Sequence, residues 1–252
     1  MICFEFPLVE RVRMFLRLES LFKRFDCLLN QGHEIAHHFA IQSLFEIMEC
    51  TARADLKSDM LQEIERQRQQ YSLLLSNEEV DQGKLSSLLA RLGDISNQLQ
   101  ANHQKFGSHL RENEWLMILK QKISVAGGAC EFDFPSYHFW LNSPESKRKE
   151  DLLGWFGSYN STAQSVNELL GLLRNNKAQS SLTAKKGNYQ QSGLGERLHM
   201  MRIFVDAKLK VIPEVSANKY VTNIRFVRES TIHAKGRQVE VDIPFQLETC
   251  RF

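Results

Sequence analysis

The sequence predicts an α+β protein: an N-terminal α-helical domain with an antiparallel hairpin of long helices, plus a β-sandwich-like domain completed by the N-terminal strand. The first observation is that apolar residues recur at three- and four-residue steps through most of residues 10–175, which is the period of an α-helix. The second is that this period ends after Asn176, and several strand patterns follow with no helix between them. The third is the short apolar run ICFEF at 2–6, which is useful as a strand only if it joins a sheet formed elsewhere in the chain.

Amphipathic helices are expected first. One helix face repeats from Glu10 until QG at 31–32 breaks the pattern, and a second helix runs from there to about Cys50. The expected apolar positions are Val12, Phe15, Phe22, Phe25 and Leu29 in the first helix, and Ile35, Phe39, Leu44, Ile47 and Met48 in the second.

The hairpin follows these two helices. Residues 54–75 keep the helical period, SNEEVDQG at 76–83 has the composition of a turn, and leucines recur at helical spacing from Leu85 to Leu99. Two long helices with a short joint predict an antiparallel pair. The pattern continues into a fifth helix at 110–119.

Strand patterns first appear after the fifth helix. AGG at 126–128 is a breaker, and ACEFDF at 129–134 alternates as a half-buried strand would. Helices are then expected from SPES at 143–146 and through 166–173.

The end of the chain is expected to be β structure. Residues 178–196 are polar and Gly-punctuated, which favours loop plus an edge strand. Strands are expected within 199–216, 219–229 and 238–250. In the second of these, one face is expected to carry Tyr220, Thr222, Ile224 and Phe226, and the other, solvated face is expected to carry Lys219, Asn223 and Arg225.

These elements give a two-domain division. We expect an α-helical domain of residues 8–122 with 145–177, and a β-strand domain of residues 1–7 with 123–144 and 178–252. A chain of 252 residues is long enough for two modest domains, each with its own core.

The charge balance gives no global signal for nucleic acid. The formal net charge is only +2, but residues 178–252 hold 12 Lys+Arg and 7 Asp+Glu, a local net of +5. A basic region on a neutral to acidic body suggests a local site for an acidic partner, or else an ordinary solvated surface. Five widely spaced cysteines without C-x-x-C argue against a disulfide framework, and no run of apolar residues is long enough for a membrane span. We therefore expect a cytoplasmic protein.

The stretch GHEIAHHFA contains the zinc-protease pattern H-E-x-x-H at His33, Glu34 and His37. In such enzymes the two histidines share a helix face and bind zinc, and the glutamate acts as general base. The longer metzincin pattern requires glycine and histidine where this chain has Ala40 and Ser43. The motif also sits at the start of its helix, so a capped or solvated polar helix start is the favoured interpretation. No other catalytic, cofactor or metal motif is recognisable.

Two blocks carry a more specific signal. They are RADLKSDMLQEIERQ at 53–67 and KQKISVAGGACEFDFPSYHFWL at 120–141. Together with FEFPLVERVRMFLRLE at 4–19 and RQVEVDIPFQLETC at 237–250, they closely resemble the ZapD family of bacterial cell-division proteins over essentially the whole chain.

The resemblance implies a binding protein and no enzymatic activity. ZapD proteins are cytoplasmic homodimers that bind the C-terminal tail of FtsZ, the tubulin-like division GTPase, and cross-link its filaments at the septum. The resemblance implies no cofactor, no small-molecule substrate, no nucleic acid and no membrane insertion. It also implies recruitment to the mid-cell division ring.

The tail of FtsZ is flexible and carries acidic and apolar residues, so a binder needs basic side chains beside apolar surface. Basic residues implicated in the family's tail site match Arg53 and Arg225. Lys219 lies on the same strand face as Arg225, and Lys120 and Lys122 match basic positions of the family signature.

One departure from the family concerns Val221, which stands where some relatives carry a basic residue; Lys219 or Arg228 then supplies the missing charge. The alternatives left open by the residues are a zinc-dependent hydrolase using His33, Glu34 and His37, and a nucleic-acid-binding module using the basic C-terminal region.

Overall fold

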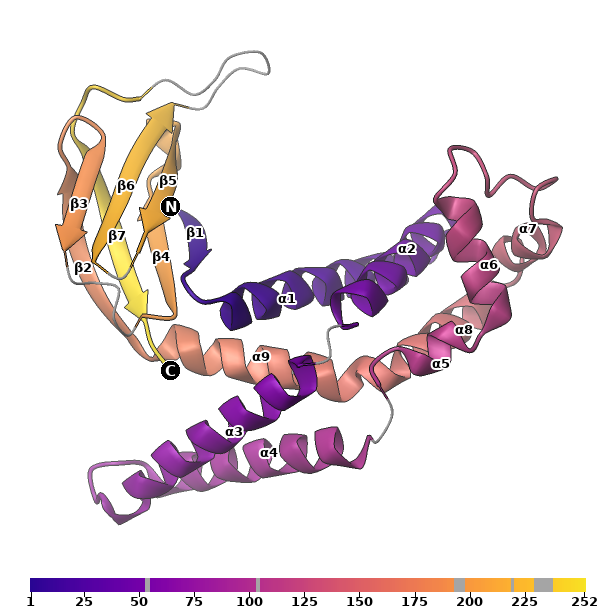
Figure 1. Cartoon of the computed structure of the whole chain (residues 1–252), viewed down its shortest axis with the longest axis horizontal. Helices are drawn as coiled ribbons and strands as arrows, with labels where there is room; N and C mark the ends of the chain where they lie inside the picture. Colours follow the sequence, from indigo (N-terminus) through magenta and orange to yellow (C-terminus); the bar gives the residue numbers. More distant parts are fainter. Residues whose placement is uncertain (53–54, 103–104, 193–197, 219, 229–237) are drawn as a thin grey trace. The chain divides into compact units, whose positions relative to one another are not determined.

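The computed structural model describes residues 1–252 except 53–54, 103–104, 193–197, 219 and 229–237 (Figure 1). It is an α+β protein with antiparallel sheets, which confirms the predicted fold class. The described residues divide into two units, Met1–Met14 with Leu170–Phe252, and Phe15–Leu169. The divisions fall inside helices α1 (Glu10–Leu29) and α9 (Asn160–Asn175).

The helical unit contains the rest of the helices. They are α2 (Glu34–Cys50), α3 (Leu56–Ser72), α4 (Gln82–Ala101), α5 (Ser108–Arg111), α6 (Glu114–Ile123), α7 (Pro135–Leu141) and α8 (Glu145–Phe156), with short 3-10 turns η1 (Leu73–Ser76) and η2 (Gly157–Tyr159). No helix in the described part of the chain combines the length and the apolar character that crossing a bilayer requires.

The first two helices bury most of the face that the sequence predicts. All five expected positions of α1 are buried, as are Leu44, Ile47 and Met48 of α2. Ile35 and Phe39 were expected in the core, but they are 59% and 46% exposed. The helical period continues through both positions, so the sequence could not show that the described residues leave this part of α2 exposed.

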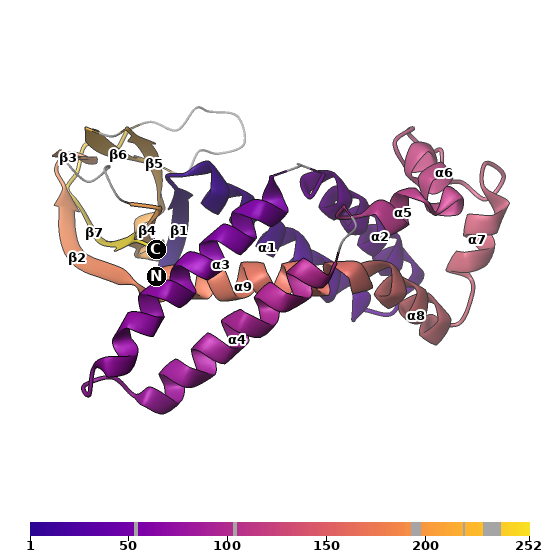
Figure 2. The ribbon, with the colours of Figure 1, turned by 60° about the horizontal axis from the view of Figure 1, so that its bottom comes forward.

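Helices α3 and α4 form the predicted antiparallel hairpin, and they lie side by side in both ribbon views (Figures 1 and 2). Met60 and Ile64 of α3 and Leu92 and Leu99 of α4 are fully buried. The Asp81 side chain caps α4 by accepting a 3.0 Å hydrogen bond from the Lys84 backbone N–H.

The prediction of a strand at 129–134 is wrong. This segment consists of consecutive turns, held by short-range bonds such as Cys130 N–H to Gly127 O and Asp133 N–H to Cys130 O. The backbone N–H groups of Cys130, Asp133 and Phe134 thus bond within the turns, and Pro135 then opens helix α7. Residues 123–144, which we expected in the β-strand domain, therefore contain a helix and lie within the Phe15–Leu169 unit.

The β unit contains two antiparallel sheets. The strands are β1 (Ile2–Pro7), β2 (Lys177–Ala184), β3 (Asn188–Ser192), β4 (Met200–Val205), β5 (Val211–Ala217), β6 (Val221–Arg228) and β7 (Ile243–Cys250), and a 3-10 turn, η3 (Ala207–Leu209), joins β4 to β5. One sheet has the order β1-β4-β7-β2 and the other has the order β3-β6-β5. Strand β1 pairs with β4 from Ile2↔Val205 to Pro7↔Met200, which confirms that the N-terminal strand completes a sheet formed by the C-terminal region.

A shared core lies between the two sheets. The Phe245 ring of β7 lies 5.2 Å from the Phe226 ring of β6 and 5.4 Å from the Tyr189 ring of β3, so side chains of both sheets interdigitate. The polar segment after residue 177, which we expected to be loop with one edge strand, supplies both β2 and β3. Each is the outer strand of its sheet, and an outer strand with a solvated face tolerates this polar composition.

Candidate functional site

Arg225 lies on β6, the central strand of the three-stranded sheet. Thr222, Ile224 and Phe226 are buried and Arg225 is exposed, which confirms the predicted alternation within β6. Tyr220 was expected on the buried face, but it precedes the strand and is 66% exposed. A central strand is hydrogen-bonded on both sides, so the sheet holds the base of this side chain rigidly.

The Arg225 guanidinium bonds to a carboxylate on the neighbouring strand. Glu214 of β5 stands directly opposite Arg225 in the register. Nε and Nη2 of Arg225 both donate to Oε2 of Glu214, at 3.0 and 2.5 Å. Both side chains are about half exposed, at 52% and 51%, so this is a surface ion pair.

Lys120 and Lys122 lie together in the last turn of α6, where cations interact favourably with the helix dipole. Their side chains reach different partners. Nζ of Lys120 lies 2.7 Å from Oε1 of Glu49 on α2, and Nζ of Lys122 lies 3.9 Å from Oδ1 of Asp133 in the turn before α7.

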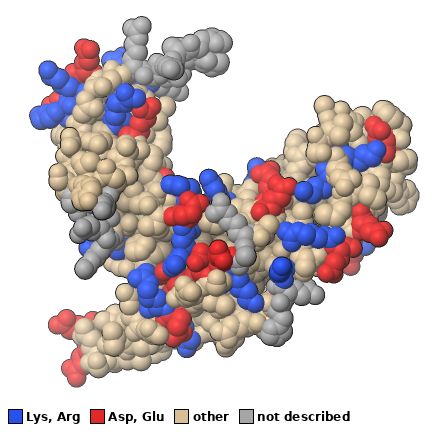
Figure 3. Space-filling view, viewed as in Figure 1, with Lys and Arg blue, Asp and Glu red and all other residues tan. Residues whose placement is uncertain are grey.

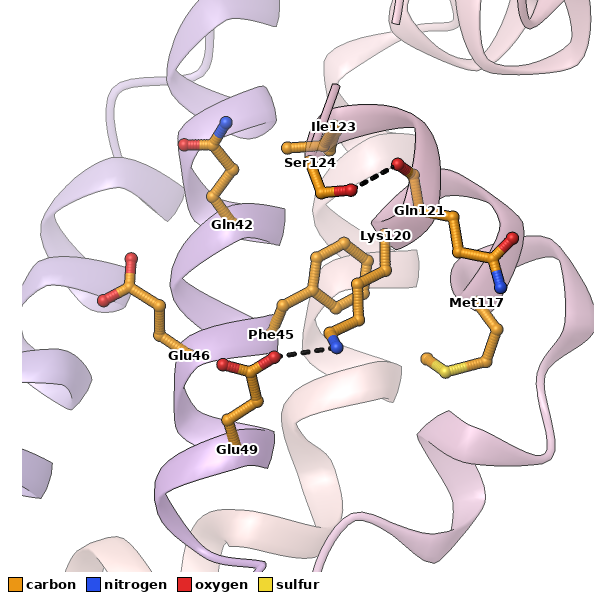
Figure 4. Close-up of a pocket in the computed structure, with 9 residues that line it drawn as sticks. All are labelled: Gln42, Phe45, Glu46, Glu49, Met117, Lys120, Gln121, Ile123 and Ser124. Carbon is orange, nitrogen blue, oxygen red and sulfur yellow. Dashed lines mark hydrogen bonds and ion pairs between the residues drawn. The ribbon is translucent and has the colours of Figure 1, made fainter. Parts of the chain in front are cut away.

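The Lys120–Glu49 pair spans a cavity of about 400 Å³ between α2 and α6 (Figure 4). Phe45 of α2 and Met117 of α6 line the cavity on either side of the Lys120 side chain. The full lining is Gln42, Phe45, Glu46, Glu49, Met117, Lys120, Gln121, Ile123 and Ser124.

A second cavity of about 340 Å³ adjoins the first, and the two share Gln42 and Ile123. It is lined by His38 and by the AGGAC turn at 126–130. His38 Nδ1 lies 2.5 Å from the Tyr137 hydroxyl, and burial lowers the pKa of His38 and raises the pKa of Tyr137. Both groups are therefore held neutral near pH 7, as hydrogen-bonding groups.

Two predicted site residues, Arg53 and Lys219, lie outside the described residues. Arg228, considered as a substitute for the charge missing at Val221, is exposed at the end of β6. On the face drawn in Figure 3, basic and acidic side chains are interspersed, with no broad field of a single sign.

The histidines of the zinc-like stretch have structural partners. His33 is the N-cap of α2, and its Nδ1 accepts a 3.1 Å hydrogen bond from the Ala36 backbone N–H. His37 is fully buried; its Nδ1 accepts from Nε of Arg148 at 3.0 Å, and its Nε2 donates to the Leu29 carbonyl at 3.3 Å. Both ring nitrogens of His37 are therefore occupied. Among the residues that the structure describes, no three His, Cys, Asp or Glu side chains are grouped as a metal site would need.

The acidic partners and the α2 wall of the cavity were not found from the sequence. Glu49 and Lys120 are separated by 71 positions, and Glu214 and Arg225 belong to different strands. Only a known strand register or helix packing places such residues opposite each other. The arrangement can bind carboxylates at the exposed cations and apolar groups in the adjoining cavity.

Comparison with known proteins decides the family. The family model described as "ZapD: Cell division protein" matches residues 16–225. The chain belongs to the ZapD family. A cell division protein ZapD of Chromobacterium violaceum is 44% identical over 252 residues, covering all of both chains. ZapD of Nitrosomonas europaea is 42% identical over 99% of this chain and 95% of its own, and ZapD of Ralstonia nicotianae is 40% identical over the whole of both. The predicted resemblance is confirmed, and membership of the ZapD family supports a role in cell division and septation.

Proposed function

We propose that this ZapD-family chain binds the C-terminal tail of FtsZ and, as a homodimer, cross-links FtsZ filaments at the division septum. It acts without catalysis and without a cofactor, in the cytoplasm, and is recruited to the mid-cell ring. Family membership supports the cell-division role, and the chemistry of the described cations supports an acidic, peptide-like ligand.

The observation that carries this proposal is the position of Lys120. The side chain stands on a helix at the wall of a cavity that also contains Phe45, Met117 and Ile123. A flexible tail with acidic and apolar residues requires this combination, because its carboxylates bind cations and its apolar side chains need a cavity. Arg225 adds a guanidinium on a rigid central strand, and Arg53, Lys219 and Lys122 complete the proposed set.

Bundling sets a geometric requirement. One site per chain cannot join two filaments, whereas a two-fold dimer presents two equivalent sites. Two sites on one particle also raise the effective strength of individually weak contacts. The homodimer is therefore part of the proposal.

The experiment is co-sedimentation with FtsZ polymers, together with light scattering to follow bundling. Both signals are expected with intact FtsZ and are lost when the FtsZ tail is deleted. The double charge reversal Arg53→Glu with Arg225→Glu should abolish tail-dependent binding. Lys84→Glu is the control for reversal of a surface charge, because Lys84 is 88% exposed at the start of α4 and does not belong to the proposed set. If the double variant binds FtsZ polymers as well as the wild type does, the assignment of Arg53 and Arg225 to the tail-binding site is wrong.

The two alternatives are not favoured. In the zinc hydrolase, a metal bound at Nδ1 of His37 would displace the hydrogen bond from Arg148, and a metal bound at Nε2 would displace the hydrogen bond to Leu29. A nucleic-acid module would show strongly salt-dependent binding to random DNA. Equal affinity for a random DNA duplex and for FtsZ would support that alternative.

A further inference from the structure

Each described cation of the candidate site already faces a carboxylate of its own chain. The pairs are Arg225–Glu214, Lys120–Glu49 and Lys122–Asp133. We propose that Glu214 and Glu49 are specificity-determining residues. They occupy the cations of the unliganded protein, and a carboxylate-rich peptide must displace them to bind. This inference rests on the proposed function, because it concerns the same basic side chains.

The geometry at Arg225 makes Glu214 a replaceable partner. Nε and Nη2 form one edge of the guanidinium, and both donate to the single oxygen Oε2 of Glu214. The strongest arrangement at such an edge is two parallel hydrogen bonds to the two oxygens of one carboxylate. An incoming carboxylate that approaches edge-on can adopt that arrangement, so it competes effectively with Glu214.

Because the pair is exposed to solvent, Glu214 and a ligand carboxylate bind Arg225 with similar free energies. Arg225 and Glu214 are each about half exposed, and an exposed ion pair contributes little net free energy. Exchanging one carboxylate for another is therefore almost neutral, and a ligand with a single carboxylate gains little. A segment with several carboxylates offers more than one group that can replace the internal partner of a given cation, and its apolar side chains add contacts of their own. The internal partners thus select for multiply acidic peptides.

The pair at Lys120 repeats this arrangement on the helical unit. Glu49 is 63% exposed and Lys120 is 34% exposed, so the acid is the more accessible member. Figure 4 shows the pair extending across the cavity in front of Phe45. A ligand carboxylate that takes the place of Glu49 would hold its neighbouring apolar side chain at the mouth of this cavity.

The test is a fluorescence-anisotropy titration of the full chain with a labelled synthetic peptide of the FtsZ C-terminal tail. Glu214→Gln and Glu49→Gln should each bind the peptide about two- to five-fold more tightly than the wild type, because the internal competitor is lost. The same peptide with its acidic residues replaced by amides should show no such gain.

Matched controls separate competition from a general change of charge. Glu240→Gln changes the net charge equally at an exposed position that takes part in none of the three pairs, and Glu65→Gln does so on α3, where the acid pairs with Arg68. Neither should tighten binding. Equal gains in these controls, or unchanged affinity in Glu214→Gln and Glu49→Gln, would overturn the inference while leaving the proposed function standing. A wild-type chain that fails to bind the peptide would instead refute the proposed function, and the inference with it.

Discussion

Nε of Arg148 on α8 donates a 3.0 Å hydrogen bond to Nδ1 of His37 on α2. Arg148 is only 6% exposed, and its guanidinium also donates to the carbonyls of Gly32, Leu141 and Ser143. The last histidine of the H-E-x-x-H stretch is therefore part of a buried link between the start of α2 and the segment from α7 to α8. This geometry requires a neutral imidazole, because Nδ1 must keep its lone pair.

Stability is expected to fall at acidic pH because of His37. Burial lowers the pKa of His37 and the Arg148 charge lowers it further, while the hydrogen bond to Leu29 and the Glu145 charge oppose the shift. The unfolded chain then binds more protons than the folded chain below about pH 6.5. This stabilisation is present above that pH and is lost as pH falls through the lowered folded-state pKa.

Urea unfolding of wild type and His37→Gln at pH 7.5 and 5.5 measures the effect. The variant should lose less stability on acidification. Some dependence will remain, because burial also lowers the pKa of His38. His33→Asn keeps a side chain that can cap α2 and should behave as the wild type. The same pH dependence in His37→Gln as in the wild type would contradict this assignment.

Gly32→Ala is expected to destabilise the chain by about 1–2 kcal/mol. Gly32 has a φ of +77°, and an added Cβ would lie 2.6 Å from Oε1 of Glu145. The carboxylate can move aside, so the left-handed backbone dominates the cost. Gly93→Ala is the opposite control. Its Cβ would meet nothing within 4 Å in the middle of α4, and this change should stabilise by about 0.5–1 kcal/mol. The urea-denaturation midpoints of both variants, compared with that of the wild type, measure these changes in stability. A Gly32→Ala variant as stable as the wild type would contradict the prediction.

Glu248→Leu is expected to cost about 3 kcal/mol or more. Glu248 is 3% exposed on β7, between Arg202, whose Nη1 donates to Oε2 at 2.6 Å, and Lys177. Arg202 also donates from Nε to Glu5 at 3.0 Å, and Glu5 bonds in turn to Arg174. Removing Glu248 takes this carboxylate away from Arg202, whose side chain is only 19% exposed, whereas Lys177 is 37% exposed and can turn toward water.

A double-mutant cycle with Arg202→Met tests the coupling within this network. The loss in the double variant should be smaller than the sum of the two single losses, as measured by urea unfolding. The exposed ion pair Arg225–Glu214 serves as the comparison for this buried network. Glu214→Gln should change the free energy of unfolding by no more than about 1 kcal/mol. Additive losses for Glu248→Leu and Arg202→Met would show that the two side chains act independently.

Local periodicity made much of the fold predictable. The helical repeat placed the buried face of α1 and the α3–α4 hairpin, and the two-residue alternation placed Arg225 on the solvated face of β6. Because a single strand is not stable without a partner strand, the sequence predicted that β1 joins the C-terminal sheet. These properties follow from the chain's own repeat, so the sequence by itself determined them, and the family could be recognised from its signature blocks.

Tertiary structure decided what lies opposite each of these residues. The alternating segment at 129–134 forms successive turns in place of a strand, and Phe39 of α2 is 46% exposed. Glu214 reaches Arg225 through the register of β5 and β6, Glu49 reaches Lys120 through the packing of α2 and α6, and Arg148 reaches His37 from another helix. Such pairings join positions that no local period relates, because they depend on register and helix packing across the whole chain.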